Sequence, residues 1–299
     1  MTDFKVSITI CSWNTVEDLR ICLSSLEDVR EEGPFEVIVF DNNSADGSPD
    51  MVERDFPWVR LIRSSRNLGF TGGQNRCIEA RRAPHAFLLN SDTIVHPGAM
   101  KTLIEYIAGH PEVGIVGPKL LNSDGSLQYS CRRFPNPVAA LFRNTPIGKL
   151  FPGNKFTREY LMTDLPHDKT TEVDWVSGAA LFARKELIDK VGFLDEKYFM
   201  FSEDVDWCYR CWDAGFKVVY VPQAVITHAI GRSTDKAPNR MIGGFHRSMF
   251  RFYRKNMVPK LNPIVRPFAV GFAGIALTLR AGMFIAKNKL DTLGRKLKQ

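Results

Sequence analysis

The chain has 299 residues, of which 44% are hydrophobic and 11% aromatic, and it carries a net charge of +7. This length and apolar content are enough to bury one large core or two modest ones, which excludes a disordered chain and a small disulfide-dependent fold. The six cysteines include no CxxC pair backed by a second metal-binding pair, so they are typical of free thiols in a reducing compartment.

The first half of the chain alternates predicted strands and helices. The apolar patterns predict strands at 5–12, 35–41, 59–63, 86–89 and 113–120, and helices at 16–27, 73–80 and 98–110. This alternation predicts an α/β fold with a doubly wound, mostly parallel sheet, whose ligands bind beyond the carboxyl ends of its strands. Residues 134–167 contain five prolines and are predicted to form an irregular surface excursion over the site.

Polar residues follow the second predicted strand. Asp41 ends that strand and is followed by a turn-forming cluster, in which a carboxylate can accept hydrogen bonds from a base or a ribose. Taken alone, an Asp at this place is equally typical of a turn or a helix cap. The segment 66–75 has three glycines just before a helix, a pattern that lets backbone N–H groups approach phosphates closely and that also occurs in ordinary helix entries.

Two further acidic clusters have alternative explanations. Asn90 and Asp92 follow a buried strand and offer an amide and a carboxylate oxygen. A divalent cation that bridges two phosphates requires such oxygen ligands, although Asp92 is also a candidate helix cap. Glu203, Asp204 and Asp206 lie at the start of a predicted helix, where acids stabilise the helix end and can also serve as a general base.

Positive charge is concentrated at the C-terminus. From Arg240 onward, thirteen Lys and Arg face one acid, so this segment carries +12 and the preceding 239 residues carry −5. Its apolar run, 267–279, is about thirteen residues long, shorter than the roughly twenty that span a bilayer. We expect a helix lying on an anionic membrane surface, with docking on the catalytic core or on a second subunit as the alternative. The basic residues expected to meet headgroups are Lys287, Lys289, Arg295, Lys296 and Lys298.

Seven segments, taken in order, resemble a known family. They are VSITICSWN, VIVFDNNSADGS, RNLGFTGGQN, FLLNSDT, VDWVSGAALFARKE, YFMFSEDVDWCYRCWDAGFKVVYVP and HAIGRST. Over about residues 4–255 the chain is similar to the family 2 glycosyltransferases, and most similar to their bacterial rhamnosyltransferase-like branch. The resemblance implies a GT-A fold, a Rossmann-like, mostly parallel sheet flanked by helices. It would form a catalytic domain at 1–240, with a nucleotide-binding half at about 1–120 and an acceptor-binding half at about 121–240. A basic helical extension, 241–299, would follow.

The resemblance also implies a nucleotide and metal site. Asp41 matches the acid that contacts the nucleotide base. Asn90 and Asp92 match the metal-binding triplet, in which Asp92 holds Mg²⁺ or Mn²⁺ against the diphosphate and Asn90 replaces the first acid. His228 resembles a distal metal ligand, although a lone His is often structural. The remaining residues assigned to the nucleotide are Asn43, Asn67, Gly69 and Arg232, the last of which would also stabilise the leaving diphosphate.

For the chemistry, the resemblance assigns Asp204 as the general base and Glu203 as its acidic neighbour or an acceptor contact. Asp206 is expected to serve the helix terminus. The residues expected to contact the donor or acceptor sugar are Gly72, Gln74, Trp175 and Gly178, with a structural role as the alternative for the strand around Trp175.

These assignments imply a metal-dependent, inverting transferase that moves a sugar from a nucleotide diphosphate donor to a lipid-linked or polysaccharide acceptor in cell-envelope synthesis. By branch likeness the donor is dTDP-L-rhamnose. The N-terminus shows no leader, so we expect a cytoplasmic enzyme at the inner face of the membrane, with no nucleic-acid partner and a possible homodimer. The alternatives are a sugar nucleotidyltransferase, whose basic Gly-rich loop is missing at Ser12–Thr15, and a non-catalytic carbohydrate-binding protein.

Overall fold

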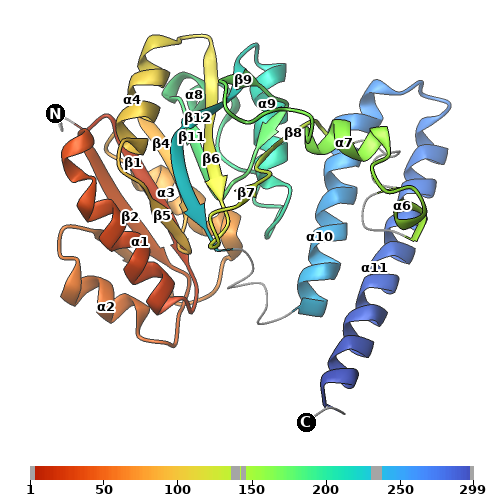
Figure 1. Cartoon of the computed structure of the whole chain (residues 1–299), viewed down its shortest axis with the longest axis horizontal. Helices are drawn as coiled ribbons and strands as arrows, with labels where there is room; N and C mark the ends of the chain where they lie inside the picture. The colour runs from red at the N-terminus through yellow and green to blue at the C-terminus, as the bar shows by residue number, and fades with distance from the viewer. Residues whose placement is uncertain (1–3, 136–141, 143–145, 230–237, 297–299) are drawn as a thin grey trace.

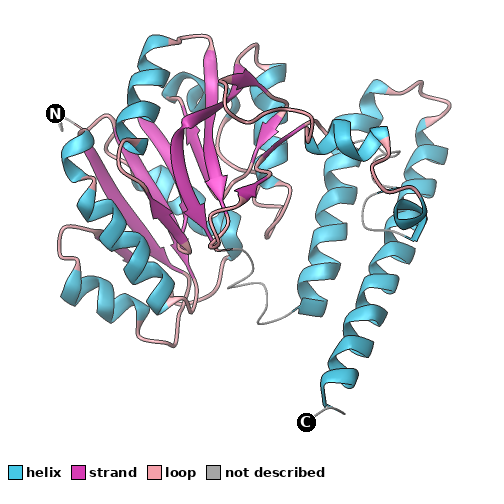
Figure 2. Cartoon of the chain, in the orientation of Figure 1, coloured by secondary structure: helices cyan, strands magenta, loops and turns pink. Residues whose placement is uncertain are grey.

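The computed structural model describes residues 4–135, 142, 146–229 and 238–296. Within them, a ten-stranded sheet is covered by helices on both faces, and two long helices stand to one side of this α/β body (Figure 1). The separation of the sheet layer from the helical pair is plain when the elements are coloured by type (Figure 2).

The strands of the main sheet and its small companion sheet have the following bounds. They are β1 (Val6–Ser12), β2 (Phe35–Asp41), β3 (Arg60–Arg63), β4 (His85–Asn90), β5 (Thr93–Val95), β6 (Val113–Leu121), β7 (Leu127–Gln128), β8 (Cys131–Arg132), β9 (Thr171–Glu172), β10 (Trp175–Val176), β11 (Ala180–Ala183) and β12 (Lys217–His228). Strand β8 pairs with β10 outside the main sheet.

The helices lie between and after these strands. They are α1 (Val16–Asp28), α2 (Ser48–Asp55), α3 (Gly69–Ala80), α4 (Ala99–Gly109), α6 (Pro146–Leu150), α7 (Lys155–Leu161), α8 (Lys185–Val191), α9 (Glu203–Asp213), α10 (Pro238–Phe252) and α11 (Arg266–Lys296), with short turns η1 (Arg30–Glu32), η3 (Tyr253–Met257) and η4 (Val258–Lys260).

The predicted α/β alternation is confirmed. The order of the main path is β3-β2-β1-β4-β11-β6-β12-β5, and β1 runs parallel to both β2 and β4. Strand β2 is buried along its whole length, as expected for a parallel strand covered on both faces. The sequence pattern did not predict β11, which lies antiparallel between β4 and β6.

Helix α3 begins at Gly69, four residues earlier than the predicted start at residue 73. Gly69 has a φ of +77°, a left-handed backbone that glycine adopts without strain. A Cβ on Gly73 would lie 2.3 Å from the Cys11 sulfur, so this glycine lets the helix pack directly on β1. The glycine-rich segment is therefore mostly the first turns of a helix, with only a short loop before it.

The excursion after residue 134 is more regular than predicted. Its described part contains α6 and α7, which Figure 1 places beside α10 and α11. At its start, Phe134 packs against Tyr209 and Phe252, and Phe252 is only 2% exposed. The end of α10 thus belongs to the same apolar core as α9, because its aromatic side chain completes that core.

The C-terminal helix is longer than the predicted thirteen-residue run. Helix α11 has 31 residues, and its stretch from Arg266 to Leu290 is long and apolar enough to cross a membrane by length and composition. The run appeared short because Arg280 interrupts it, but arginine does not break a helix. One exposed stripe of large apolar side chains runs along it, made by Phe268, Phe272, Ile275, Leu279, Met283 and Leu290.

Candidate active site

The predicted nucleotide acid lies at the carboxyl edge of the sheet. Strand register sets Asp41 opposite Ser12, and Cys11 opposite Asn90, so the ends of three adjacent strands meet there. The Asp41 side chain is buried, and its Oδ2 accepts a hydrogen bond from the Ser44 N–H at 3.1 Å. Its Oδ1 has no hydrogen-bond partner within the described part of the chain. A buried carboxylate oxygen in this state is a vacant acceptor for a ligand.

The loop between β3 and α3 is held by two asparagines. Asn67 accepts a hydrogen bond from the Gly69 N–H at 2.8 Å, which forms a local turn. Asn42, which the sequence analysis did not single out, accepts from the Leu68 N–H at 2.6 Å and donates to the Gly69 carbonyl at 3.0 Å. Asn43 is exposed and left-handed, with a φ of +65°. Asn42 therefore fixes the loop, and its position next to Asp41 was the available signal.

Two predicted sugar contacts, Gln74 and Gly72, are buried within the described structure. Gln74 is fully buried, and its Nε2 donates to the Thr9 carbonyl at 3.2 Å. Gly72 is buried in the first turns of α3, where a Cβ would lie 2.9 Å from the Leu68 Cβ. Because α3 begins before them, Gln74 is turned toward β1 and Gly72 packs against Leu68 of the preceding loop.

Asp92 and His228 lie side by side, although 136 positions separate them in the sequence. The Asp92 Oδ1 is 3.4 Å from the His228 Nε2, and Asn90 Nδ2 is 3.2 Å from the same nitrogen. The His228 Nδ1 is 2.8 Å from the Gln128 Oε1, while the Gln128 amide nitrogen donates to the His228 carbonyl. With the ring proton on Nδ1 donated to Gln128, the Nε2 lone pair accepts from the Asn90 amide, and the Asp92 carboxylate lies beside it.

These residues fit a divalent cation in one specific way. A neutral imidazole nitrogen and a carboxylate oxygen are both metal ligands, and the second ring nitrogen has the hydrogen-bond partner that orients such ligands. Among the residues that the structure describes, no group of three or more His, Cys, Asp or Glu side chains is placed to hold a metal. A two-ligand site suits Mg²⁺ or Mn²⁺ that completes its shell with substrate phosphates and water.

The predicted base, Asp204, lies in the first turn of α9 and contacts the connection between β10 and β11. The Asp204 Oδ2 accepts from the Gly178 N–H at 2.9 Å, and its Oδ1 is 2.8 Å from the Val205 N–H. Next to Gly178, the Ala179 carbonyl accepts from the Asn90 N–H at 2.9 Å. The base and the Asn90 strand end are therefore joined through two consecutive residues.

Glu203, which is buried, and Asp204, which is half-buried, form an acidic pair. Burial raises the pKa of Glu203 well above its ordinary value, and the charge of Asp204 raises it further. Burial also raises the pKa of Asp204, while the Gly178 and Val205 N–H groups and the positive charge of Arg132 act in the opposite direction. The Glu203 Oε2 is buried with no partner among the described residues. Raised carboxyl pKa values of this kind are typical of acid–base sites.

Trp175 is not available for stacking on a sugar. It is 6% exposed, its Nε1 donates to the Arg133 carbonyl at 2.8 Å, and the Arg132 guanidinium lies 5.1 Å from its ring centre. It is buried because β10 pairs with β8 and packs against α9, a pairing that the sequence pattern did not predict. Arg132 is a residue that the sequence analysis missed, and it brings a positive charge near Asp204.

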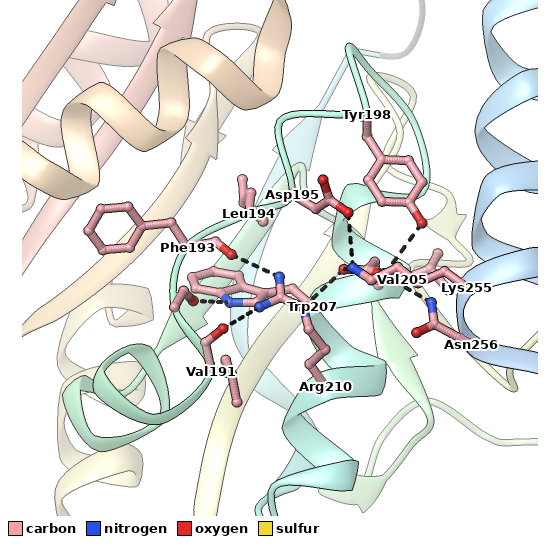
Figure 3. A network of polar contacts seen from close by, with 12 residues as sticks. Val191, Phe193, Leu194, Asp195, Tyr198, Val205, Trp207, Arg210, Lys255 and Asn256 are labelled. Atoms are coloured by element: carbon pink, nitrogen blue, oxygen red, sulfur yellow. Dashed lines mark hydrogen bonds and ion pairs between the residues drawn. The ribbon is translucent and has the colours of Figure 1, made fainter. Parts of the chain in front are cut away.

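Asp206 does not serve only the helix terminus. It is fully buried, and side chains from the preceding loop, from α9 and from η3 all bond to its carboxylate. Figure 3 labels these partners, which are Tyr198, Arg210, Lys255 and Asn256. Asp206 does lie in the first turn of α9, as expected, but its partners from η3 are about fifty residues away in the sequence, beyond what a local pattern reveals. Arg232, the predicted diphosphate contact, lies outside the described residues.

The family model and two relatives that match this chain are all glycosyltransferases. A family model described as "Glycosyltransferase like family 2" matches residues 4–253. The chain is 30% identical, over 84% of each chain, to an N-acetylglucosaminyl-diphospho-decaprenol L-rhamnosyltransferase of Mycobacterium tuberculosis. It is 26% identical to the dTDP-rhamnosyl transferase RfbF of Shigella flexneri, covering 82% of this chain and 79% of the relative.

The fold is shared with solved structures. The mannosyltransferase PcManGT from Pyrobaculum calidifontis, solved in complex with GDP-Man and Mn²⁺, superposes with a TM-score of 0.58 at 15% identity, covering 97% of this chain and 80% of that one. At this identity the likeness concerns the fold alone, and it confirms the predicted GT-A architecture.

Proposed function

Because this chain belongs to the glycosyltransferase-like family 2, we propose that it is an inverting, metal-dependent transferase that moves a sugar from a nucleotide diphosphate to an acceptor hydroxyl. The observation that carries the proposal is the short connection between Asn90 and Asp204. One strand link, Gly178–Ala179, bonds to the base on one side and to the metal-side strand end on the other. The strand end proposed to bind the donor and the residue proposed to activate the acceptor are therefore close to each other.

In this proposal Asp204 acts as the general base. It takes the proton of the acceptor hydroxyl as that oxygen bonds to the anomeric carbon and the bond to the diphosphate oxygen breaks. The raised pKa of Asp204 favours proton acceptance, because a carboxylate with a pKa nearer the working pH is the stronger base. Glu203 lies beside it as the second member of the pair.

Donor binding is assigned to the residues at the ends of β2, β4 and β12 and in the loop before α3. Asp41 would accept hydrogen bonds from the nucleoside through its free Oδ1, and Asn43, Asn67 and Gly69 would line the same wall. Asp92 and His228 would hold Mg²⁺ or Mn²⁺, which supplies positive charge to the departing diphosphate. Arg232 is proposed for the same diphosphate on the family resemblance.

For the substrates, we propose dTDP-L-rhamnose as donor and a glycan linked to a polyprenyl diphosphate as acceptor, in cell-envelope glycan synthesis. The printed names of two relatives support this choice, since both are rhamnosyltransferases and one acts on a decaprenol-linked sugar.

The C-terminal helix would keep the enzyme at the inner face of the membrane. No residue in the apolar stretch of α11 is fully buried, although α10 packs along one side of it, and the segment from Arg240 onward carries a net charge of +12. In a helix of this kind the apolar stripe enters the acyl boundary of an anionic bilayer, and the basic residues bind its headgroups. We also propose that the catalytic domain extends to about Lys260, because Phe252 and Val258 are buried beyond the expected boundary at 240.

The direct test is nucleotide diphosphate release by the purified full-length protein. A panel of nucleotide sugars is incubated with and without Mn²⁺ and a polyprenyl diphosphate-linked N-acetylglucosamine. We expect release from dTDP-L-rhamnose that needs both metal and acceptor. Release from a different donor would replace the rhamnose assignment, and no release from any donor, together with no nucleotide-induced rise in Tm, would overturn the proposed function.

A further inference from the structure

We propose that Lys255, near the C-terminus, is a positioning residue for the general base and acts through the buried carboxylate of Asp206. The inference rests on the proposed role of Asp204. It gives the segment that links the catalytic domain to α11 a task in the reaction, beyond holding the enzyme at a surface.

Asp206 has both carboxylate oxygens occupied. Its Oδ2 accepts from the Arg210 Nε and from the Lys255 Nζ, each at 2.9 Å. Its Oδ1 accepts from the Asn256 Nδ2 at 2.9 Å, with the Tyr198 hydroxyl at 3.4 Å (Figure 3). Because both oxygens of this buried carboxylate are paired, these contacts fix the position of Asp206.

Lys255 connects this carboxylate to a second one. Its Nζ is 3.0 Å from the Asp195 Oδ2, and the Arg251 guanidinium reaches the same oxygen at 3.1 Å. The Lys255 side chain is 33% exposed, so it can be changed without opening the core. Through this one ammonium group, η3 holds the loop before α9 and the first turn of α9 together.

The local backbone explains why the first turn of α9 needs this support. Phe201 and Ser202, directly before Glu203, both have left-handed backbone, with φ values of +71° and +64°. Such backbone is unfavourable for residues other than glycine and persists only where surrounding contacts hold it. No side-chain hydrogen bond from Ser202 caps the described helix start. The turn that carries Asp204 is therefore held mainly by tertiary contacts.

The geometry of η3 suits this task. Tyr253–Met257 form a single π-helical turn, which is wider than an α-helical turn. Two consecutive side chains, Lys255 and Asn256, consequently reach the same carboxylate. The Asn256 carbonyl also accepts from the Tyr209 hydroxyl at 2.9 Å, which ties the turn to the middle of α9.

The charge of Lys255 can be tested through the pKa of the acidic pair, which a loss of packing alone would not change. Two charged groups, Arg210 from α9 and Lys255 from η3, pair with Asp206, and Asp195 from the loop before α9 pairs with Lys255 and with Arg251. Of the acidic pair itself, Glu203 is influenced by Asp206, and Asp204 by Arg132 from β8. Asp206 is negative and disfavours ionisation of Glu203. Removing the Lys255 charge leaves Asp206 less compensated, so we expect the pKa of Glu203 to rise further, and the pKa of Asp204 with it because the two carboxyl groups are adjacent.

The test compares two lysines in the full-length enzyme. Lys255→Met removes the ammonium group from Asp206, whereas Lys260→Met removes one that pairs with Asp213 at 3.5 Å, at the other end of the same helix. The pH profile of kcat/KM is measured for both, with Lys255→Arg as the charge-retaining variant. A general base must be deprotonated, so the acid limb of the profile reports its pKa.

We expect Lys255→Met to lower kcat about tenfold and to move the acid limb upward by roughly 0.5–1 pH unit. Lys260→Met should stay within about twofold of wild type with an unmoved limb, and Lys255→Arg should restore the limb. An unmoved limb in a folded Lys255→Met variant, or an equal shift in Lys260→Met, overturns the inference alone. A wild-type chain that transfers no sugar overturns the proposed function and this inference with it.

Discussion

Substitution of Gly178 tests the assignment of Asp204 as the general base. The Gly178 N–H donates to the Asp204 Oδ2 at 2.9 Å, and a Cβ built on Gly178 would lie 3.2 Å from the Asp204 Cβ and 3.4 Å from that same oxygen. In Gly178→Ala the carboxylate must therefore move by about a few tenths of an ångström, since 3.2 Å is closer than ordinary van der Waals contact. The substitution removes no polar group from the site.

Because a displacement of about 1 Å at a reacting group costs roughly 100-fold in rate, a shift of a few tenths predicts a fall in kcat of about 3- to 10-fold. The hydrogen bond to the Gly178 N–H lowers the pKa of Asp204, so weakening it also moves the acid limb of the pH profile upward. Donor affinity should not change. Steady-state kinetics across pH, with donor binding measured separately by calorimetry, distinguish these effects.

The matched control is Gly243→Ala in α10, where a new Cβ would meet no described atom within 4 Å. It should leave kcat unchanged and raise stability by about 0.5–1 kcal/mol, as expected when alanine replaces a helical glycine. A Gly178→Ala enzyme that is folded and has wild-type kcat would refute the assignment of Asp204 as the base held by this strand link.

The remaining predictions concern the acidic pair, the metal and the tail. Asp204→Asn should keep donor binding and lose transfer by about 10²- to 10⁴-fold in single-turnover assays. The folded-state pKa of Glu203 is raised, so ionising it costs stability as pH rises above the usual glutamate range; Glu203→Gln should therefore raise Tm at pH 8 and have little effect at pH 4. Asp92→Asn and His228→Ala should each abolish the Mn²⁺-dependent rise in Tm caused by a nucleotide diphosphate. Truncation after Asn262 should release the protein from anionic vesicles while donor hydrolysis stays measurable, and retained vesicle binding would assign α11 to protein contacts.

Local patterns in the sequence were enough for the nucleotide-binding half of the fold. The buried run of β2 ends at Asp41 and that of β4 ends at Asn90, and both ends can be read from a few neighbouring residues. Parallel pairing with β1 then brings the two ends to one edge without further information. For this reason the predicted sheet and the position of Asp41 agree with the structure.

The direction of the side chains within those segments could not be predicted from local patterns. Gln74 lies in the glycine-rich stretch that was predicted to contact a sugar, yet it is fully buried, because α3 starts at Gly69 and turns that face onto β1. Trp175 is buried by the pairing of β10 with β8, which joins residues about forty apart. Helix α11 also extends beyond the apolar run, since the single charge at Arg280 ends a pattern but not a helix.

What the sequence determined by itself is therefore local: the order of strands and helices, the polar residues at strand ends, and the basic, apolar C-terminus. Only the tertiary structure decided which distant groups meet. Asp92 reaches His228, Gly178 reaches Asp204, and Asp206 reaches Lys255 through contacts between residues 26 to 136 positions apart. Periodicity and turn propensity act over a few residues, whereas these contacts depend on the order of strands in the sheet and on how α10 returns to α9.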